Sequence, residues 1–160
     1  MRHLQKDIDN AVQELKGFFT CMAIDCRGRG WSYYLDDNAP ESFADLKANT
    51  NKQCIPIATS GSDTSIYGFE ANSNFRFWHD VTHLELDKSF SEDGERTVIG
   101  RHKEQAIEYG LSSLALTILM IDTLGQVEYY FENKRFVNNQ ETFIHTYLNQ
   151  GKRCAMALRG

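Results

Sequence analysis

Two histidines spaced four residues apart, His79 and His83, are the side chains of this sequence best placed to do chemistry together. On an α-helix, residues i and i+4 project from the same side, so two imidazoles at this spacing can share one metal ion. Phe75 and Leu86 lie on the same helical stripe, which indicates that the histidines face the interior of the protein. The spacing therefore predicts half of a metal site on one helix.

The next helical segment supplies two further candidate ligands. Glu95 and His102 share a stripe with Ile99 and Ala106. Because only a short turn separates the two segments, we expect their helices to pack as antiparallel neighbours and bring all four candidate ligands to one point. Three imidazole nitrogens and one carboxylate suit zinc, iron or manganese.

Asp80, which directly follows the first histidine, is the candidate catalytic residue. HDVTH has the histidine spacing of the HExxH helix of zinc metalloproteases, in which a glutamate polarises the zinc-bound water. Asp80 replaces that glutamate, is one methylene shorter and projects about 100° away from the histidines. No downstream segment shows the additional zincin ligand pattern, which argues against protease activity. Asp122, at the end of an apolar run, could supply another ligand, orient an imidazole or mark a solvent boundary.

The same residues also have a purely structural interpretation. Buried histidines often donate to a carbonyl or carboxylate, and glutamates in a first turn complement the helix dipole. A separate motif, RGRGWSYY, joins Arg27 and Arg29 to aromatic faces that can stack on bases. A basic turn before an edge strand explains it as well. The net charge of −5 and the lack of a P-loop or GxGxxG argue against a nucleic-acid role.

Hydrophobic periodicity predicts a mainly α protein whose loop-rich N-terminal half contains one or two short strands. An amphipathic helix is expected over residues 3–18, and from Thr20 to Asn38 its pattern gives way to a loop and a short strand. Residues 49–73, interrupted by CIPIA and SIYGF, are expected to form loops with one or two short strands. Further helices are predicted from Pro40 to about Lys47, from the cap Asn74 to Leu86, from the capping-box residue Ser89 to about Tyr109, from Leu114 to about Phe131 and from Thr142 to Leu148.

Composition places the chain in the globular class and predicts one domain over residues 1–160. Hydrophobic residues make up 41% and charged residues 24%, so a core can form without disulfides. The longest apolar run, 114–121, is too short for the roughly 18 residues of a membrane span. Four cysteines without a CxxC pair, and an N-terminus without a signal pattern, predict a reduced cytoplasmic protein. A disulfide or thiolate site at Cys21 and Cys26 is the alternative.

The segment FRFWHDVTHLELDKSFSEDGE resembles a signature of small bacteriophage proteins, in which WHDxxHL precedes FSxxGE. The resemblance covers about Phe75 to His102. It implies a viral origin, a place in the host cytoplasm and a linked role for His79, Asp80, His83 and Glu95. It implies no particular reaction.

Two functions fit these observations. The first is a helical metal-binding protein whose ion activates water on an unknown small-molecule substrate or, as iron, binds oxygen. The second is a non-enzymatic phage protein that binds and blocks a host defence or transcription enzyme. It would use RGRGWSYY or the loops of residues 49–73, and its histidines would be structural.

Overall fold

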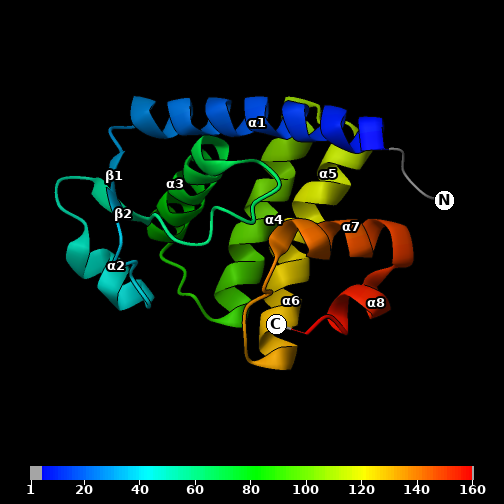
Figure 1. Ribbon diagram of the computed structural model, residues 1–160. Helices are drawn as coiled ribbons and strands as arrows, with labels where there is room; N and C mark the ends of the chain where they lie inside the picture. Colours follow the sequence, from blue (N-terminus) through cyan, green and yellow to red (C-terminus); the bar gives the residue numbers. More distant parts are fainter. Residues whose placement is uncertain (1–4, 160) are drawn as a thin grey trace.

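The computed structural model describes residues 5–159, and its fold is mainly α, as predicted. Helix α1 lies across one end of the molecule, above α3, α4 and α5 (Figure 1). A short sheet and α2 lie on one side, and α7 and α8 on the other. The elements are α1 (Gln5–Gly28), β1 (Ser32–Asp36), α2 (Phe43–Asn49), β2 (Cys54–Ala58), α3 (Phe69–Leu86), α4 (Glu92–Tyr109), α5 (Ser113–Met120), the π-helical turn η1 (Ile121–Gly125), α6 (Gln126–Asn133), α7 (Gln140–Gln150) and α8 (Lys152–Met156).

Helix α1 is longer than the sequence pattern predicted. The first two residues of the predicted helix, 3 and 4, lie outside the described residues. The loop predicted from Thr20 is wrong, because the helix continues to Gly28. Phe19, Met22 and Cys26 are all buried and continue the helical stripe that packs on the core. The glycines and aromatics that suggested a loop begin only where this stripe ends.

Helix α3 begins at Phe69, six residues earlier than predicted. Gly68, with φ of 79°, is its N-cap, so Asn74 lies inside the helix and does not cap it. The segment SIYGF forms turns and the start of α3 rather than a strand. Residues on several sides of α3 are buried, including Phe77, Trp78 and His83, which makes this helix central, as its apolar sequence predicted.

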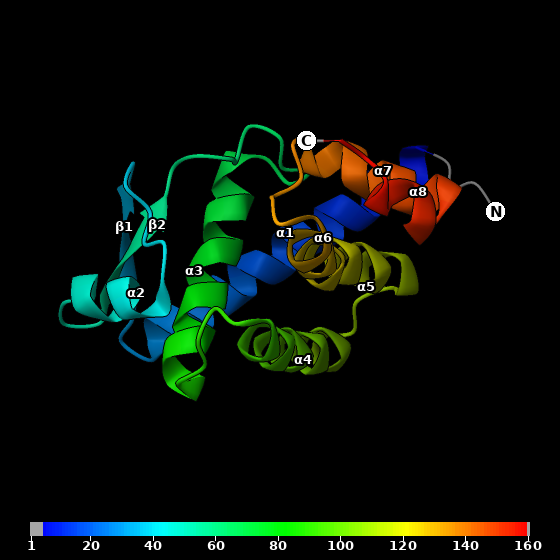
Figure 2. The ribbon, with the colours of Figure 1, turned by 90° about the horizontal axis from the view of Figure 1, so that it is seen from below.

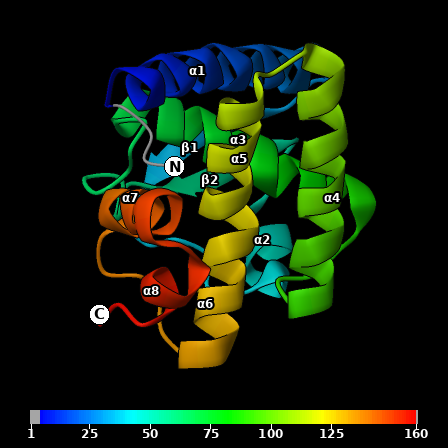
Figure 3. The ribbon, with the colours of Figure 1, turned by 90° about the vertical axis from the view of Figure 1, so that its right-hand side faces the viewer.

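Helix α4 and the continuous rod formed by α5, η1 and α6 run side by side below α1 (Figure 3). Gly110, with φ of 88°, ends α4 at the predicted break. The predicted helix over 114–131 exists, but its middle is the π-helical turn Ile121–Gly125. A π-helical turn contains one residue more than an α-helical turn, which rotates the following helix relative to the preceding one. Such turns often lie near functional sites.

The only sheet in residues 5–159 joins β1 and β2 in parallel, with Ser32 opposite Cys54 and Asp36 opposite Ala58. Helix α2 connects them and starts at the N-cap Ser42, later than the predicted start at Pro40. Helix α7 was predicted, although it is longer than 142–148, and α8 was not.

Aromatic side chains of α1, of α3 and of the turn before α3 form the centre of the core. Phe18 meets Trp78 edge to face, with ring centroids 5.2 Å apart, and Phe19 meets Tyr67 in the same way at 4.8 Å. All four residues are at most 2% exposed. This packing holds α3 rigidly, and α3 carries both histidines. Within residues 5–159 no helix combines the length and the apolar character needed to cross a membrane.

Candidate metal centre

The candidate site lies where the end of α3 meets the start of α4. The two helices cross instead of packing as antiparallel neighbours, contrary to the prediction (Figures 2 and 3). The connecting turn, residues 87–91, is nevertheless short enough to bring the last two turns of α3 against α4. His79, His83 and Glu95 meet there, as their spacing predicted.

The donor atoms of these three residues form a nearly equilateral triangle. Nε2 of His79 lies 3.1 Å from Nε2 of His83 and 3.1 Å from Oε2 of Glu95, and Nε2 of His83 lies 3.2 Å from the same oxygen. The side chain of His83 is fully buried, whereas those of His79 and Glu95 are 18% and 17% exposed. The His79 and Glu95 side chains therefore keep limited contact with solvent.

The end of α3 fixes the orientation of His83. Asp87 adopts the left-handed conformation, with φ of 50°, and turns the chain out of the helix. The Lys88 carbonyl consequently lies 2.7 Å from Nδ1 of His83. Because a carbonyl can only accept, Nδ1 carries the proton. In the neutral ring, Nε2 then directs a lone pair towards His79 and Glu95.

The start of α4 fixes the position of Glu95. Ser91, two residues later than the predicted cap Ser89, is the N-cap and accepts from the Gly94 amide at 3.1 Å. Gly94 packs so closely that an added Cβ would lie 2.0 Å from the Ser89 carbonyl oxygen. Burial raises the pKa of Glu95, but the charges and hydrogen bonds of His79 and His83 outweigh burial and hold it below its ordinary value. Glu95 is thus an anion facing two imidazoles.

His102 is buried beside the triangle and contacts its far side. Its Nε2 lies 3.0 Å from Nδ1 of His79, the ring nitrogen that faces away from the triangle. Burial holds the pKa of His102 well below its ordinary value, and the charges of His79 and His83 add to this effect. By contrast, Glu95 raises the pKa of His79 despite burial, which alone would lower it. The assignment of His102 as a metal ligand stays a prediction.

Asp80 lies on the neighbouring face of α3, as its place in the helix predicted. Its carboxylate interacts electrostatically with the triangle residues and with Arg76, one turn earlier. Burial raises its pKa to about 6, and His79 is the strongest opposing influence. Nothing in these contacts tests a catalytic role.

Asp122 lies in a second polar cluster and is not among the three residues whose donor atoms converge. It is buried in η1, accepts from the Gln126 amide and faces the buried Tyr67 hydroxyl. Burial raises its pKa to about 6. Arg76, which donates to the Ala58 and Ser60 carbonyls at 2.8 and 2.6 Å, contributes the positive charge. The only signal in the sequence concerns Arg76, which precedes Asp80 by four residues on α3 and therefore shares a face with a carboxylate.

Several side chains of the RGRGWSYY motif contact other residues of the same protein. Arg29 donates to Glu85 through Nε and Nη2, and the Trp31 indole donates to the same carboxylate at 2.9 Å. The Arg27 guanidinium lies over the Tyr33 ring, 5.7 Å from its centroid. These contacts join the start of the sheet to the end of α3.

The alternative of a disulfide or thiolate at Cys21 and Cys26 is wrong. All four cysteines are free, and Cys26 is buried. Burial raises the pKa of the Cys26 thiol to about 11, despite the charge of Arg29.

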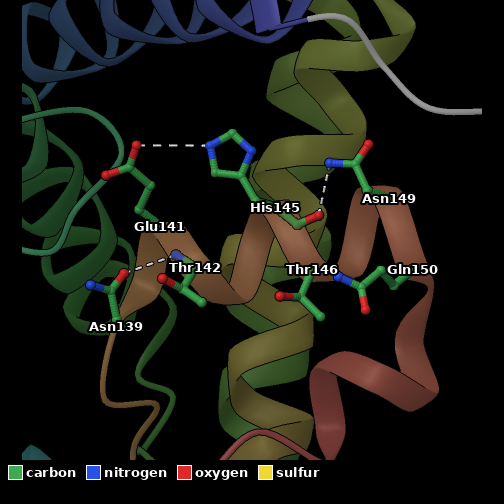
Figure 4. Close-up of a pocket in the computed structure, with 7 residues that line it drawn as sticks. All are labelled: Asn139, Glu141, Thr142, His145, Thr146, Asn149 and Gln150. Atoms are coloured by element: carbon green, nitrogen blue, oxygen red, sulfur yellow. Dashed lines mark hydrogen bonds and ion pairs between the residues drawn. The ribbon is translucent and has the colours of Figure 1, made fainter.

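Helix α7 carries another histidine next to a carboxylate, which provides a useful contrast. His145 and Glu141 lie one turn apart over a shallow polar depression, with Nε2 3.8 Å from Oε1 (Figure 4). Neither residue belongs to a group of three potential ligands among the described residues. A histidine–carboxylate pair alone is thus not unusual in this chain, whereas the triangle on α3 and α4 is.

Comparisons with models of protein families, with curated proteins and with solved structures found no match for this chain.

Proposed function

We propose that this protein binds one divalent transition-metal ion through Nε2 of His79, Nε2 of His83 and Oε2 of Glu95. The separations of the three donor atoms, 3.1, 3.1 and 3.2 Å, carry the proposal. Ligands at about 2.0–2.1 Å from one ion, in tetrahedral or octahedral geometry, lie about 2.9–3.4 Å apart. The triangle therefore matches one face of either polyhedron.

The electrostatics of the triangle also support a bound cation. The Lys88 carbonyl directs the lone pair of His83 towards a ring nitrogen and a carboxylate oxygen. Three electron-rich atoms at this spacing repel one another unless a proton or a metal ion lies among them. Two histidines and one carboxylate on one face of an ion suit zinc, iron or manganese and leave further positions free.

An ion held by only three protein ligands would keep a free position for water. A metal with three protein ligands and a free position lowers the pKa of bound water to about 7, which supplies hydroxide at neutral pH. Asp80, beside the triangle, is the candidate to take up the proton from this water. We therefore place metal-assisted hydrolysis of a small molecule first among possible reactions. A phage origin and a place in host cytoplasm stay part of this proposal.

Metal analysis of protein purified without an affinity tag tests the proposal. We expect about one equivalent of metal in the natural protein, and at least about 100-fold weaker zinc binding in His83→Ala and Glu95→Gln. His145→Ala and Glu141→Gln are matched controls, because they remove the same residue types from the pair on α7. Unchanged affinity in the triangle variants, or an equal loss in the controls, would refute the site.

A further inference from the structure

His102 is held in one orientation by the residues around it. It is completely buried, and its ring lies over that of Trp78, with centroids 3.7 Å apart and planes 33° from parallel. Phe75 covers another edge of the ring, with centroids 6.3 Å apart. The ring therefore cannot turn towards the triangle without displacing core aromatics, and its Nε2 points to Nδ1 of His79.

The hydrogen bond between His79 and His102 permits a single arrangement of protons once His79 binds an ion. Binding through Nε2 leaves the proton of the neutral His79 ring on Nδ1, from which it is donated to Nε2 of His102. Nε2 of His102 must then be the acceptor, so that the proton of the neutral His102 ring lies on Nδ1.

Gln105 is suitably placed to complete this chain. It lies three residues after His102 on α4, and its Oε1 is buried, as is Nδ1 of His102. Neither atom has a hydrogen-bond partner within the described residues. Gln105 thus offers a buried carbonyl without a partner, one turn from the buried N–H that this arrangement places on His102.

We infer that His102 and Gln105 are positioning residues, which hold His79 with its Nε2 lone pair directed at the metal, and that His102 is not itself a ligand. This inference rests on the proposed metal site. Each histidine of the triangle then has its own partner on the opposite nitrogen: the Lys88 carbonyl for His83 and the His102 ring for His79. Partners of this kind fix the ring orientation and typically change metal affinity 10–100-fold.

Cobalt binding by His102 variants tests the inference, because Co²⁺ reports its ligands through visible absorption. His102→Phe keeps a flat ring against Trp78 but removes the acceptor for His79. We expect about 10–100-fold weaker Co²⁺ binding with one equivalent still bound and an unchanged spectrum at saturation. His102→Gln restores an acceptor close to the position of Nε2, and we expect it to recover most of the lost affinity.

The alternative outcomes are distinct. A changed cobalt spectrum in both variants, without recovery in His102→Gln, would show that His102 is a ligand and overturn the inference. Gln105→Met is a second variant, at a residue separated from the metal by His102 and His79. We expect it to weaken Co²⁺ binding several-fold, while the metal-free variant melts at the temperature of the natural protein. Unchanged affinity in Gln105→Met and His102→Phe would also overturn it. Failure of the natural protein to bind Co²⁺ or Zn²⁺ would instead refute the proposed function.

Discussion

Replacing Gly94 by alanine should disturb the metal centre without touching any ligand. The new Cβ would lie 2.0 Å from the Ser89 carbonyl oxygen and 2.9 Å from its carbon, both backbone atoms that cannot rotate away. Relief of this contact requires a shift of about 1 Å between the turn and the start of α4, because Cβ contacts shorter than 3.0 Å are essentially never found. Overpacking of this kind costs about 1–3 kcal/mol. For a chain of this length, that lowers the melting temperature by about 2–12 °C.

The same shift should weaken metal binding, because Glu95 is the next residue. A movement of about 1 Å is large against the 3.1–3.2 Å separations of the triangle, and we expect at least a tenfold loss of zinc affinity. Melting curves and zinc titrations of Gly94→Ala measure both effects. Gly100→Ala is the matched control: it lies on the same helix, its added Cβ meets nothing within 4 Å, and alanine favours a helix by up to about 1 kcal/mol. A Gly94→Ala variant with the melting temperature and zinc affinity of the natural protein would refute the reasoning.

Three further effects can be measured. Without metal, the free energy of unfolding should fall as the pH rises from about 4.5 to 6 in urea titrations. The pKa values of Asp80 and Asp122, each raised to about 6, favour the protonated folded state in this range, and these two groups outweigh His102, whose lowered pKa makes stability rise with pH up to its ordinary value of 6.5. The lowered pKa of Glu95 adds no further stability above its ordinary value of 4.5, and the raised pKa of His79 removes stability only above 6.5. Rising stability between pH 5 and 6 would contradict these shifts. In protein loaded with free metal at 100 times the Kd, addition of a chelator should lower the melting temperature by about 5–11 °C. An unchanged melting temperature would mean that the folded state does not bind metal in preference to the unfolded state. Glu85→Ala should lower the free energy of unfolding, measured in urea titrations, by about 1 kcal/mol, because it removes the acceptor of three hydrogen bonds at a half-exposed site. An unchanged free energy of unfolding would show that solvent replaces these bonds fully.

Helical periodicity was sufficient to predict the three residues of the triangle and that they lie on two successive helices, although it grouped His102 with them. His79 and His83 had to share a face once α3 was a helix, and a short turn had to bring Glu95 near them. The crossing of α3 and α4 was not predictable, because crossing angles follow from side-chain packing between elements far apart in the sequence, such as that of Phe18 and Phe19 of α1 against Trp78 of α3. The start of α3 was misplaced because Gly68 caps it through its backbone conformation, without a side-chain hydrogen bond.

The partners that orient the ligands lay beyond sequence reasoning for a different reason. The Lys88 carbonyl belongs to the backbone and has no signature in residue type. His102 was recognised as an inward-facing residue, but a single stripe cannot tell which nitrogen of His79 it meets. Gln105 carries no signal except its place one turn after His102. Helical spacing brings residues together, and only three-dimensional packing decides which atoms touch.

The turn between α3 and α4 links the occupancy of the centre to local opening of the backbone. Its Lys88 carbonyl holds His83, and its Ser89 backbone packs against the glycine that precedes Glu95. If the proposed ion binds, it would hold His83 and Glu95 together and therefore also close this turn, and its release would loosen the turn. The rate of amide hydrogen exchange within residues 87–91 should therefore report whether the metal site is occupied. It can be read in protein whose substrate and reaction are still unidentified.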